Sequence, residues 1–239
     1  CSKQDAYDYP DTSGRDQSAD RLYTRQYTLN WVNSVKLDES WTLGGGADWQ
    51  RDMLDDSSRS SGVAFPSDAD ERDNTGLYAL AQFDNQVWQA ELSGRSDDNE
   101  QFGRHNTWQT GAGWRFVEDY RLSARYGTGF RAPSFNDLYY PGSGNPDLKP
   151  EESKSHELML DGQTAGVEWR LTGYRNDFEQ MIQWAPDSQG MWTPQNVGKA
   201  RIEGVELEGE FETGWLSHRV SAEYKDPKGK ATDKQLQLI

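Results

Sequence analysis

A two-residue alternation of apolar and polar side chains constrains this chain more than any other feature. From Trp41 to Trp49 the odd positions carry Trp, Leu, Gly, Ala and Trp, whereas the even positions from Thr42 to Gln50 carry Thr, Gly, Gly, Asp and Gln. A period of two over this length is that of a β-strand and not of a helix. The alternation recurs at residues 108–116, 120–130, 167–172, 205–211 and 220–224. The sequence therefore predicts an all-β protein.

Aromatic residues on the apolar face recur eight positions apart. The pairs are Trp41 with Trp49, Tyr23 with Trp31, and Trp108 with Phe116. Eight residues of strand span roughly 26 Å, or roughly 20 Å along the axis of a barrel whose strands tilt by about 40°. That height is close to the apolar band between the two aromatic girdles of an outer-membrane barrel. The polar face carries Arg, Glu, Asp and Gln, which suits a water-filled lumen, whereas a soluble sandwich should show Val- and Ile-rich inner positions on its apolar face.

The connections between the expected strands alternate between short and long. We expect strands at 22–34, 40–51, 74–84, 86–97, 107–117, 120–131, 155–163, 166–183, 199–213 and 216–226. The links 52–73, 98–106, 132–154 and 184–198 are long and rich in Asp, Ser, Gly, Pro and Asn, and the others are short. This alternation predicts an antiparallel, up-and-down transmembrane β-barrel segment of about ten strands, with all short turns at one end. We expect one partial barrel domain over residues 1–239, opening with a loop-like stretch at 1–20.

Composition removes several other classes of protein. No apolar run approaches the roughly 18 residues of a membrane-spanning helix. Low hydrophobic content (33%) and a net charge of −15 would favour disorder, but ten Trp, eleven Tyr and eight Phe argue against it. The acidic balance makes nucleic acid an unfavourable partner. No nucleophile–base pair or phosphate-binding loop stands out, so we expect no enzyme, and His105, His156 and His218 are too far apart to suggest a metal site.

One block of sequence resembles the mid-barrel region of the TonB-dependent outer-membrane receptors. It comprises Gly129–Ser134 (GFRAPS), Gly144–Glu151 (GNPDLKPE) and a following glutamate. Gly173–Asp177 (GYRND), Gly198–Arg201 (GKAR) and Gly204–Glu206 (GVE) follow in the order and spacing of that family. Residues 95–110 and Ala47–Gln50 (ADWQ) look more specifically like its cobalamin-transporting branch.

The resemblance implies a barrel of about 22 strands with an N-terminal plug, placed in the bacterial outer membrane and energised through TonB. We expect this chain to be a mid-barrel portion that lacks the plug, the TonB box and the terminal strand. The function implied for the parent protein is uptake of cobalamin (vitamin B12). Two alternatives stay open: uptake of a siderophore or other metal chelate, and a soluble β-sheet binding module.

Candidate binding residues fall in two groups. Tyr139, Tyr140, Trp184 and Trp192 lie in long loops and could stack on a corrin or another flat ligand, or could simply pack within the loops. Asp20 aligns loosely with a substrate-contacting threonine of the cobalamin transporters.

Carboxylates crowd the first twenty residues. Asp5, Asp8, Asp11 and Asp16 could supply the oxygen ligands that calcium prefers, although their spacing matches no EF-hand. We therefore expect either an extracellular calcium site or a solvated acidic loop.

Overall fold

The computed structural model describes residues 2–8, 20–58, 71–229 and 234–235. Its elements, in chain order, are β1 (Ser2–Asp8), β2 (Asp20–Lys36), β3 (Trp41–Ser58), β4 (Glu71–Asp84), β5 (Trp88–Asn99), β6 (Gly103–Val117), β7 (Tyr120–Arg131), α1 (Phe135–Tyr139), β8 (Glu151–Thr164), β9 (Val167–Glu179), β10 (Ile182–Pro186), β11 (Trp192–Asn196), β12 (Lys199–Thr213), β13 (Leu216–Gly229) and β14 (Lys234–Gln235).

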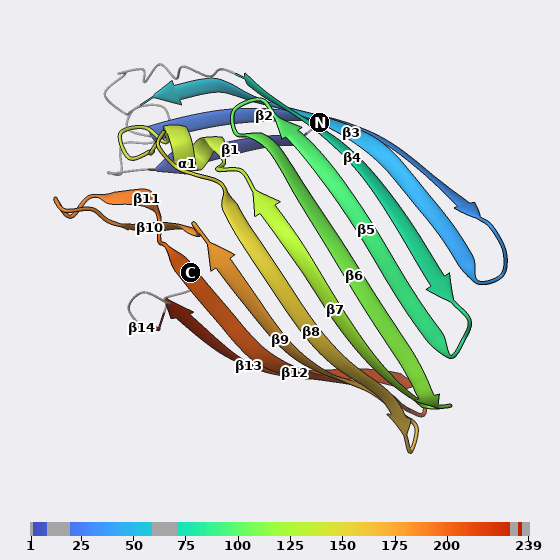
Figure 1. Cartoon of the computed structure of the whole chain (residues 1–239). Coiled ribbons are helices and arrows are strands. Elements are labelled where there is room, and N and C mark those ends of the chain that lie inside the picture. Colours follow the sequence, from blue (N-terminus) through green and yellow to red (C-terminus); the bar gives the residue numbers. More distant parts are fainter. Residues whose placement is uncertain (1, 9–19, 59–70, 230–233, 236–239) are drawn as a thin grey trace.

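Twelve strands form one antiparallel sheet in the order β1-β2-β3-β4-β5-β6-β7-β8-β9-β12-β13-β14. Neighbours in the sheet are neighbours in the chain, except that the separate β10–β11 hairpin lies between β9 and β12 in sequence. Figure 1 shows a single curved layer, with the tight turns at one end and α1 and the β10–β11 hairpin at the other. We call these the turn end and the loop end. The predicted antiparallel, up-and-down sheet is confirmed, although it has twelve strands where about ten were expected, and in the described part of the chain its two ends, β1 and β14, do not pair.

Several predicted boundaries are wrong. Some strands are longer than expected, as β3 runs to Ser58 and not to residue 51, and β8 begins at Glu151 and not at residue 155. Residues 2–8, expected in a loop, form β1, which pairs with β2 from Ser2 opposite Gln26 to Asp8 opposite Asp20. The long strand expected at 166–183 ends at Glu179 because Gln180 adopts a positive φ of 57°. The loop expected at 184–198 contains most of the β10–β11 hairpin. Main-chain pairing decides these segments, and their side chains show no clear alternation.

The turn end is built from short polar turns. The Asp38 carboxylate accepts hydrogen bonds from the backbone N–H groups of Ser40 and Trp41, at 2.7 and 2.8 Å. Asn85 caps the next turn in the same way, accepting from the N–H of Trp88 at 2.7 Å. Such Asx turns let two or three residues reverse a strand, which keeps the register of each hairpin fixed.

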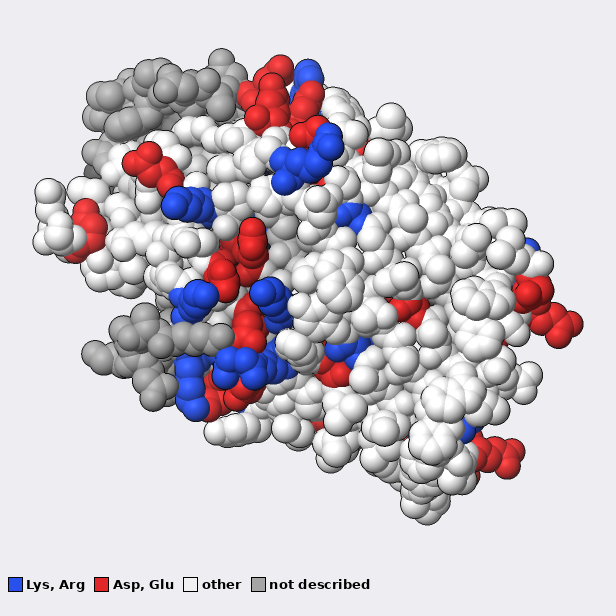
Figure 2. All heavy atoms as spheres, in the orientation of Figure 1, with Lys and Arg blue, Asp and Glu red and all other residues white. Residues whose placement is uncertain are grey.

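The two faces of the sheet differ as the sequence predicts. On the outward face, cross-strand neighbours are apolar and exposed, forming a belt whose members include Leu29, Leu77, Leu92, Leu158, Leu171, Val205, Leu207 and Val220. Figure 2 shows this belt as a broad white region with few charged atoms, bordered toward the loop end by red and blue side chains. A large exposed apolar surface is expected where lipid replaces water as the solvent.

Aromatic side chains border the belt at the turn end. Trp88 stacks on Trp114 with ring centroids 5.5 Å apart, and contacts of 5.7 to 6.2 Å continue through Phe116 and Tyr120 to Trp169. This chain of rings matches the predicted girdle. The eight-residue spacing is less uniform than expected, because Trp31 lies opposite Ala47, within the belt and not at its turn-end border.

None of the helices in the described ranges is long and apolar enough to cross a membrane.

Candidate functional site at the loop end

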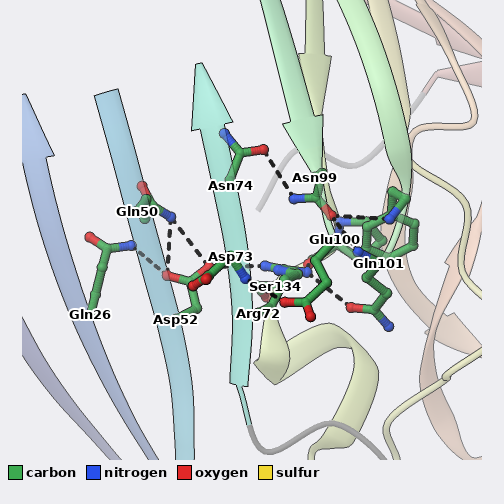
Figure 3. Close-up of polar contacts among 12 residues, drawn as sticks. Gln26, Gln50, Asp52, Arg72, Asp73, Asn74, Asn99, Glu100, Gln101 and Ser134 are labelled. Atoms are coloured by element: carbon green, nitrogen blue, oxygen red, sulfur yellow. Dashed lines mark hydrogen bonds and ion pairs between the residues drawn. The ribbon is translucent and has the colours of Figure 1, made fainter. Parts of the chain in front are cut away.

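A network of polar side chains joins three strands on the lumenal face near the loop end (Figure 3). The Asp52 carboxylate of β3 accepts hydrogen bonds from Gln26 Nε2 of β2 at 2.9 Å and from Gln50 Nε2 at 3.0 Å. It also forms an ion pair with Arg72 Nη2 of β4 at 3.1 Å. Because these side chains project from adjacent strands at the same height, the network fixes that part of the wall.

Arg72 connects this network to the long connection at 132–150. Its side chain is buried, and Nη1 donates to the carbonyl oxygen of Pro133 at 2.8 Å. The guanidinium carbon also lies 5.0 Å from the ring centroid of Phe135 and 5.8 Å from that of Phe102. A buried guanidinium with a carboxylate, a carbonyl and two aromatic partners holds the connection against the sheet.

The connection itself has a small dry core built around α1. Ser134 caps the helix, and Ser134 and Asp137 bond each other's backbone N–H groups in a capping box. Leu138 is 1% exposed. The core consists of Leu54, Phe135, Leu138, Leu148 and Ile182, with Phe102, Tyr139 and Tyr140 packed against it. Its members come from several separate segments, so the loop end is a packed structure and not a set of independent loops.

Hydrogen bonds tie the 132–150 connection to the β10–β11 hairpin. Asn145 Nδ2 donates to the carbonyl of Pro194 at 3.0 Å. Asn196 and Lys149 exchange two bonds, of 2.8 Å from the Lys149 N–H and 2.9 Å to its carbonyl. The side-chain amides of Asn145 and Asn196 therefore align two segments about fifty positions apart in sequence.

Glu151, the first residue of β8, connects the start of the β10–β11 hairpin to the end of β7. Its carboxylate accepts from the backbone N–H of Ile182 and from Nε of Arg131, each at 2.5 Å. The hydrogen bond from Arg131 to Glu151 raises the pKa of the arginine, since the carboxylate stabilises the charged guanidinium. One side chain thus fixes the ends of β7, β8 and β10 relative to one another.

A second lumenal cluster lies beside the first. Arg95 of β5 forms ion pairs of 2.6 Å with both Asp48 and Asp97. Asn74 donates to Asp97 at 2.9 Å and accepts from Asn99 at 3.2 Å. The wall below the loop end therefore presents fixed carboxylate, amide and guanidinium groups to the lumen.

Two of the four aromatic residues predicted to bind a flat ligand contact each other. Tyr140 and Trp184 meet edge to face with centroids 5.8 Å apart. Trp192 lies on the hairpin face that Trp184 occupies, because Trp184 pairs with Pro194 and Pro186 pairs with Trp192, and its side chain is 55% exposed. Tyr139 instead packs on Phe135 and accepts a hydrogen bond from Gln101.

The acidic residues of the first segment are placed only in part. Asp20 begins β2, and Asp5 and Asp8 lie on β1, whereas Asp11 and Asp16 lie outside the described residues. Within the described ranges, no three His, Cys, Asp or Glu side chains are grouped to hold a metal ion. The calcium site therefore stays a prediction.

Sequence reasoning missed the residues that organise the site, above all Arg72, Asp52, Arg95 and Asp97. A signal was present for one pair, since Arg95 and Asp97 are two positions apart on a strand and so share a face. Nothing in the sequence indicated that Arg72 would contact Pro133.

Comparison with known proteins agrees with the fold. Residues 2–238 match the family model described as TonB dependent receptor-like, beta-barrel. The chain is 44% identical over 223 residues to the vitamin B12 transporter BtuB of Photobacterium profundum, covering 92% of this chain and 36% of that protein. It is 43% identical over 214 residues to BtuB of Vibrio vulnificus, covering 89% of this chain and 34% of the relative. The chain thus spans about a third of the length of these curated relatives.

Solved structures show the same architecture at lower sequence identity. The copper transporter OprC superposes with a TM-score of 0.75 at 17% identity, over 91% of this chain and 39% of its own. This likeness bears on the fold alone. Together with the exposed apolar belt, the family match shows that the soluble β-sheet module considered from the sequence is wrong.

Proposed function

The chain belongs to the TonB-dependent receptor β-barrel family, and from that premise we propose that its parent protein takes up cobalamin through the outer membrane. The carrying observation is the identity of 43 to 44%, over about nine-tenths of the chain, to relatives named as vitamin B12 transporters. The location in the bacterial outer membrane follows from the family. In this proposal the chain is one partial barrel domain over residues 1–239, and the parent protein draws energy from TonB.

The loop end supports ligand capture. Tyr140, Trp184 and Trp192 present aromatic surface beside a wall of fixed polar groups, and a corrin offers a flat apolar face with polar amides at its edge. We assign ring stacking to Trp184 and Trp192, and positioning of Trp184 to Tyr140. Tyr139 and Asp20 remain secondary candidates for contact.

The rival within the family is a receptor for a siderophore or another metal chelate. Solved siderophore receptors share the fold at about 20% identity, which says nothing about the ligand of this chain. The matched family is described as receptor-like and the curated relatives are named as transporters, so we infer that the parent protein is not an enzyme. Lipid is the partner proposed for the outward face, and no nucleic acid partner is proposed.

Calorimetric titration of the purified parent protein tests the proposal. We expect saturable binding of cyanocobalamin and none of ferric enterobactin. Trp192→Ala should weaken cyanocobalamin binding by roughly tenfold, the usual loss for an aromatic residue at the centre of a binding site. Trp215→Ala is the matched control, because Trp215 is 90% exposed at the turn end. Absence of cyanocobalamin binding at micromolar ligand, with binding of a ferric chelate, would reverse the assignment.

Calcium at Asp5, Asp8, Asp11 and Asp16 is a separate proposal. Carboxylate oxygens are its preferred ligands, and the net charge of −15 leaves many carboxylates available. We expect calcium to raise the affinity for cyanocobalamin, and the quadruple Asp→Asn variant to lose that response. If the affinity for cyanocobalamin is the same with calcium and with a chelator, the calcium proposal is wrong.

A further inference from the structure

The lipid-facing belt has a gap at Gly173. In one cross-strand row of the outward face, Gly173 lies between Leu158 of β8 and Val205 of β12, and Tyr224 of β13 follows. A Cβ atom at Gly173 would meet nothing within 4 Å. The neighbouring side chains stand out from the sheet, with Leu158 56%, Val205 50% and Tyr224 71% exposed. They leave a hollow of about 650 Å³ over the glycine.

Charged and ionisable groups border the hollow on its loop-end side. His156, Arg175 and Glu203 form the next cross-strand row, and all three line the hollow. Arg175 donates through Nε to Asp177 at 2.8 Å and keeps 43% of its side chain exposed. One row further lies Lys154, which is exposed and forms no ion pair with any residue that the structure describes.

The charge balance of this border differs from that of the chain. The two rows carry Lys154, Arg175, Arg201 and Lys228 against Asp177, Glu203 and Asp226. The strip is thus slightly positive in a chain whose net charge is −15. Asp177 is shared, since Arg201 Nε also donates to it, at 2.9 Å. Loss of Arg175 would therefore not leave that carboxylate unpaired.

An apolar hollow directly below a cationic edge, on a surface that faces lipid, has the layout of a lipid molecule. Acyl chains occupy the belt, and phosphate groups lie at the height where the charged rows begin. We propose that the Gly173 hollow holds an acyl chain of a phosphorylated lipid of the surrounding leaflet, and that Arg175 and Lys154 contact its phosphate. The site is distinct from the loop-end site and does not depend on which ligand is transported.

Native mass spectrometry of the whole detergent-purified protein tests this assignment, with phosphatidylglycerol as the charged probe and diacylglycerol as the chain-only probe. Wild type should retain phosphatidylglycerol in preference to diacylglycerol. Gly173→Leu should retain neither, because the leucine fills the hollow. Lys154→Gln with Arg175→Gln should lose affinity for phosphatidylglycerol by roughly fivefold per cation removed, while diacylglycerol retention is unchanged.

Gly94→Leu is the matched control. Gly94 lies on the outward face between Ala79 and Trp108, and a Cβ there also meets nothing within 4 Å, but the next residue of its strand on that face toward the loop end is Ser96. This variant should retain lipid as wild type does. Equal retention by wild type and Gly173→Leu would overturn the site, and an unchanged lipid preference in the double glutamine variant would overturn the phosphate contact. Cyanocobalamin titration of folded Gly173→Leu should match wild type, which separates this test from that of transport.

Discussion

The belt and the loop end are stabilised in different ways. In the belt, a side chain such as Leu207 is 50% exposed and neighbours only the adjacent strands and the surroundings, so each position acts nearly alone. At the loop end, Leu138 is 1% exposed and contacts segments distant in sequence. The belt therefore depends on the solvent it faces, whereas the loop end depends on its own packing. The following substitutions test that difference.

The largest effect is expected in the loop-end core. Leu138→Ala removes a fully buried side chain and leaves a cavity, which costs about 2–5 kcal/mol of local stability. Protease cleavage within 132–150 and hydrogen exchange of α1 should both increase. The matched belt variant is Leu77→Ala, at a side chain 60% exposed. Because lipid fills the space, its cost should be much smaller. Equal losses for the two leucines would remove the distinction.

A charged side chain should destabilise the belt although a shortened one does not. Leu207→Arg places a guanidinium in the belt, at a cost of about 2–4 kcal/mol near the bilayer midplane. Ser221→Arg is the control, because Ser221 is exposed and lies opposite the lumenal Glu208 on the neighbouring strand. Urea unfolding in lipid vesicles should show a loss for the first variant and almost none for the second. If both are tolerated, the outward face does not contact lipid.

The same difference explains what the sequence could predict. A strand such as β7 alternates regularly, and its predicted bounds of 120–131 agree with Tyr120–Arg131. The alternation is readable because it is local in sequence: lipid on one face of the sheet favours apolar residues, and water on the other favours polar ones. The hairpin of β10 and β11 was missed because it is aligned by contacts with remote segments, from Glu151 to Ile182 and from Asn196 to Lys149. Tyr140 and Trp184 were predicted as ligand contacts from their residue type, but their meeting depends on that same alignment.

Substitution of Arg72 tests how much the polar contacts, as distinct from apolar packing, stabilise the loop end. Arg72→Met keeps much of the buried volume but removes the bonds to Asp52 and to the Pro133 carbonyl, at a cost of about 1.5–3 kcal/mol. Asp52 keeps Gln26 and Gln50 as donors, which limits the loss. Hydrogen exchange at residues 132–140 should rise. Arg219→Met, which removes an exposed pair with Glu210, should leave that segment unchanged.

The smallest effect is expected at the border between the two regions. Arg51 and Asp73 lie two positions beyond Trp49 and Thr75 toward the loop end, and their side chains form a two-bond pair at 2.7 and 2.6 Å. The hydrogen bond from Arg51 lowers the pKa of Asp73 below its ordinary 3.8. A lowered folded-state pKa contributes stability that is present above pH 3.8 and is lost as pH falls through the folded value. Asp73→Asn should therefore unfold slightly earlier than wild type at pH 7, and the difference should vanish in acid. Because about a third of each side chain stays exposed, the difference in stability between wild type and Asp73→Asn should stay small. A difference between wild type and Asp73→Asn that persists in strong acid, or grows there, would show that Asp73 acts through packing and not through its charge.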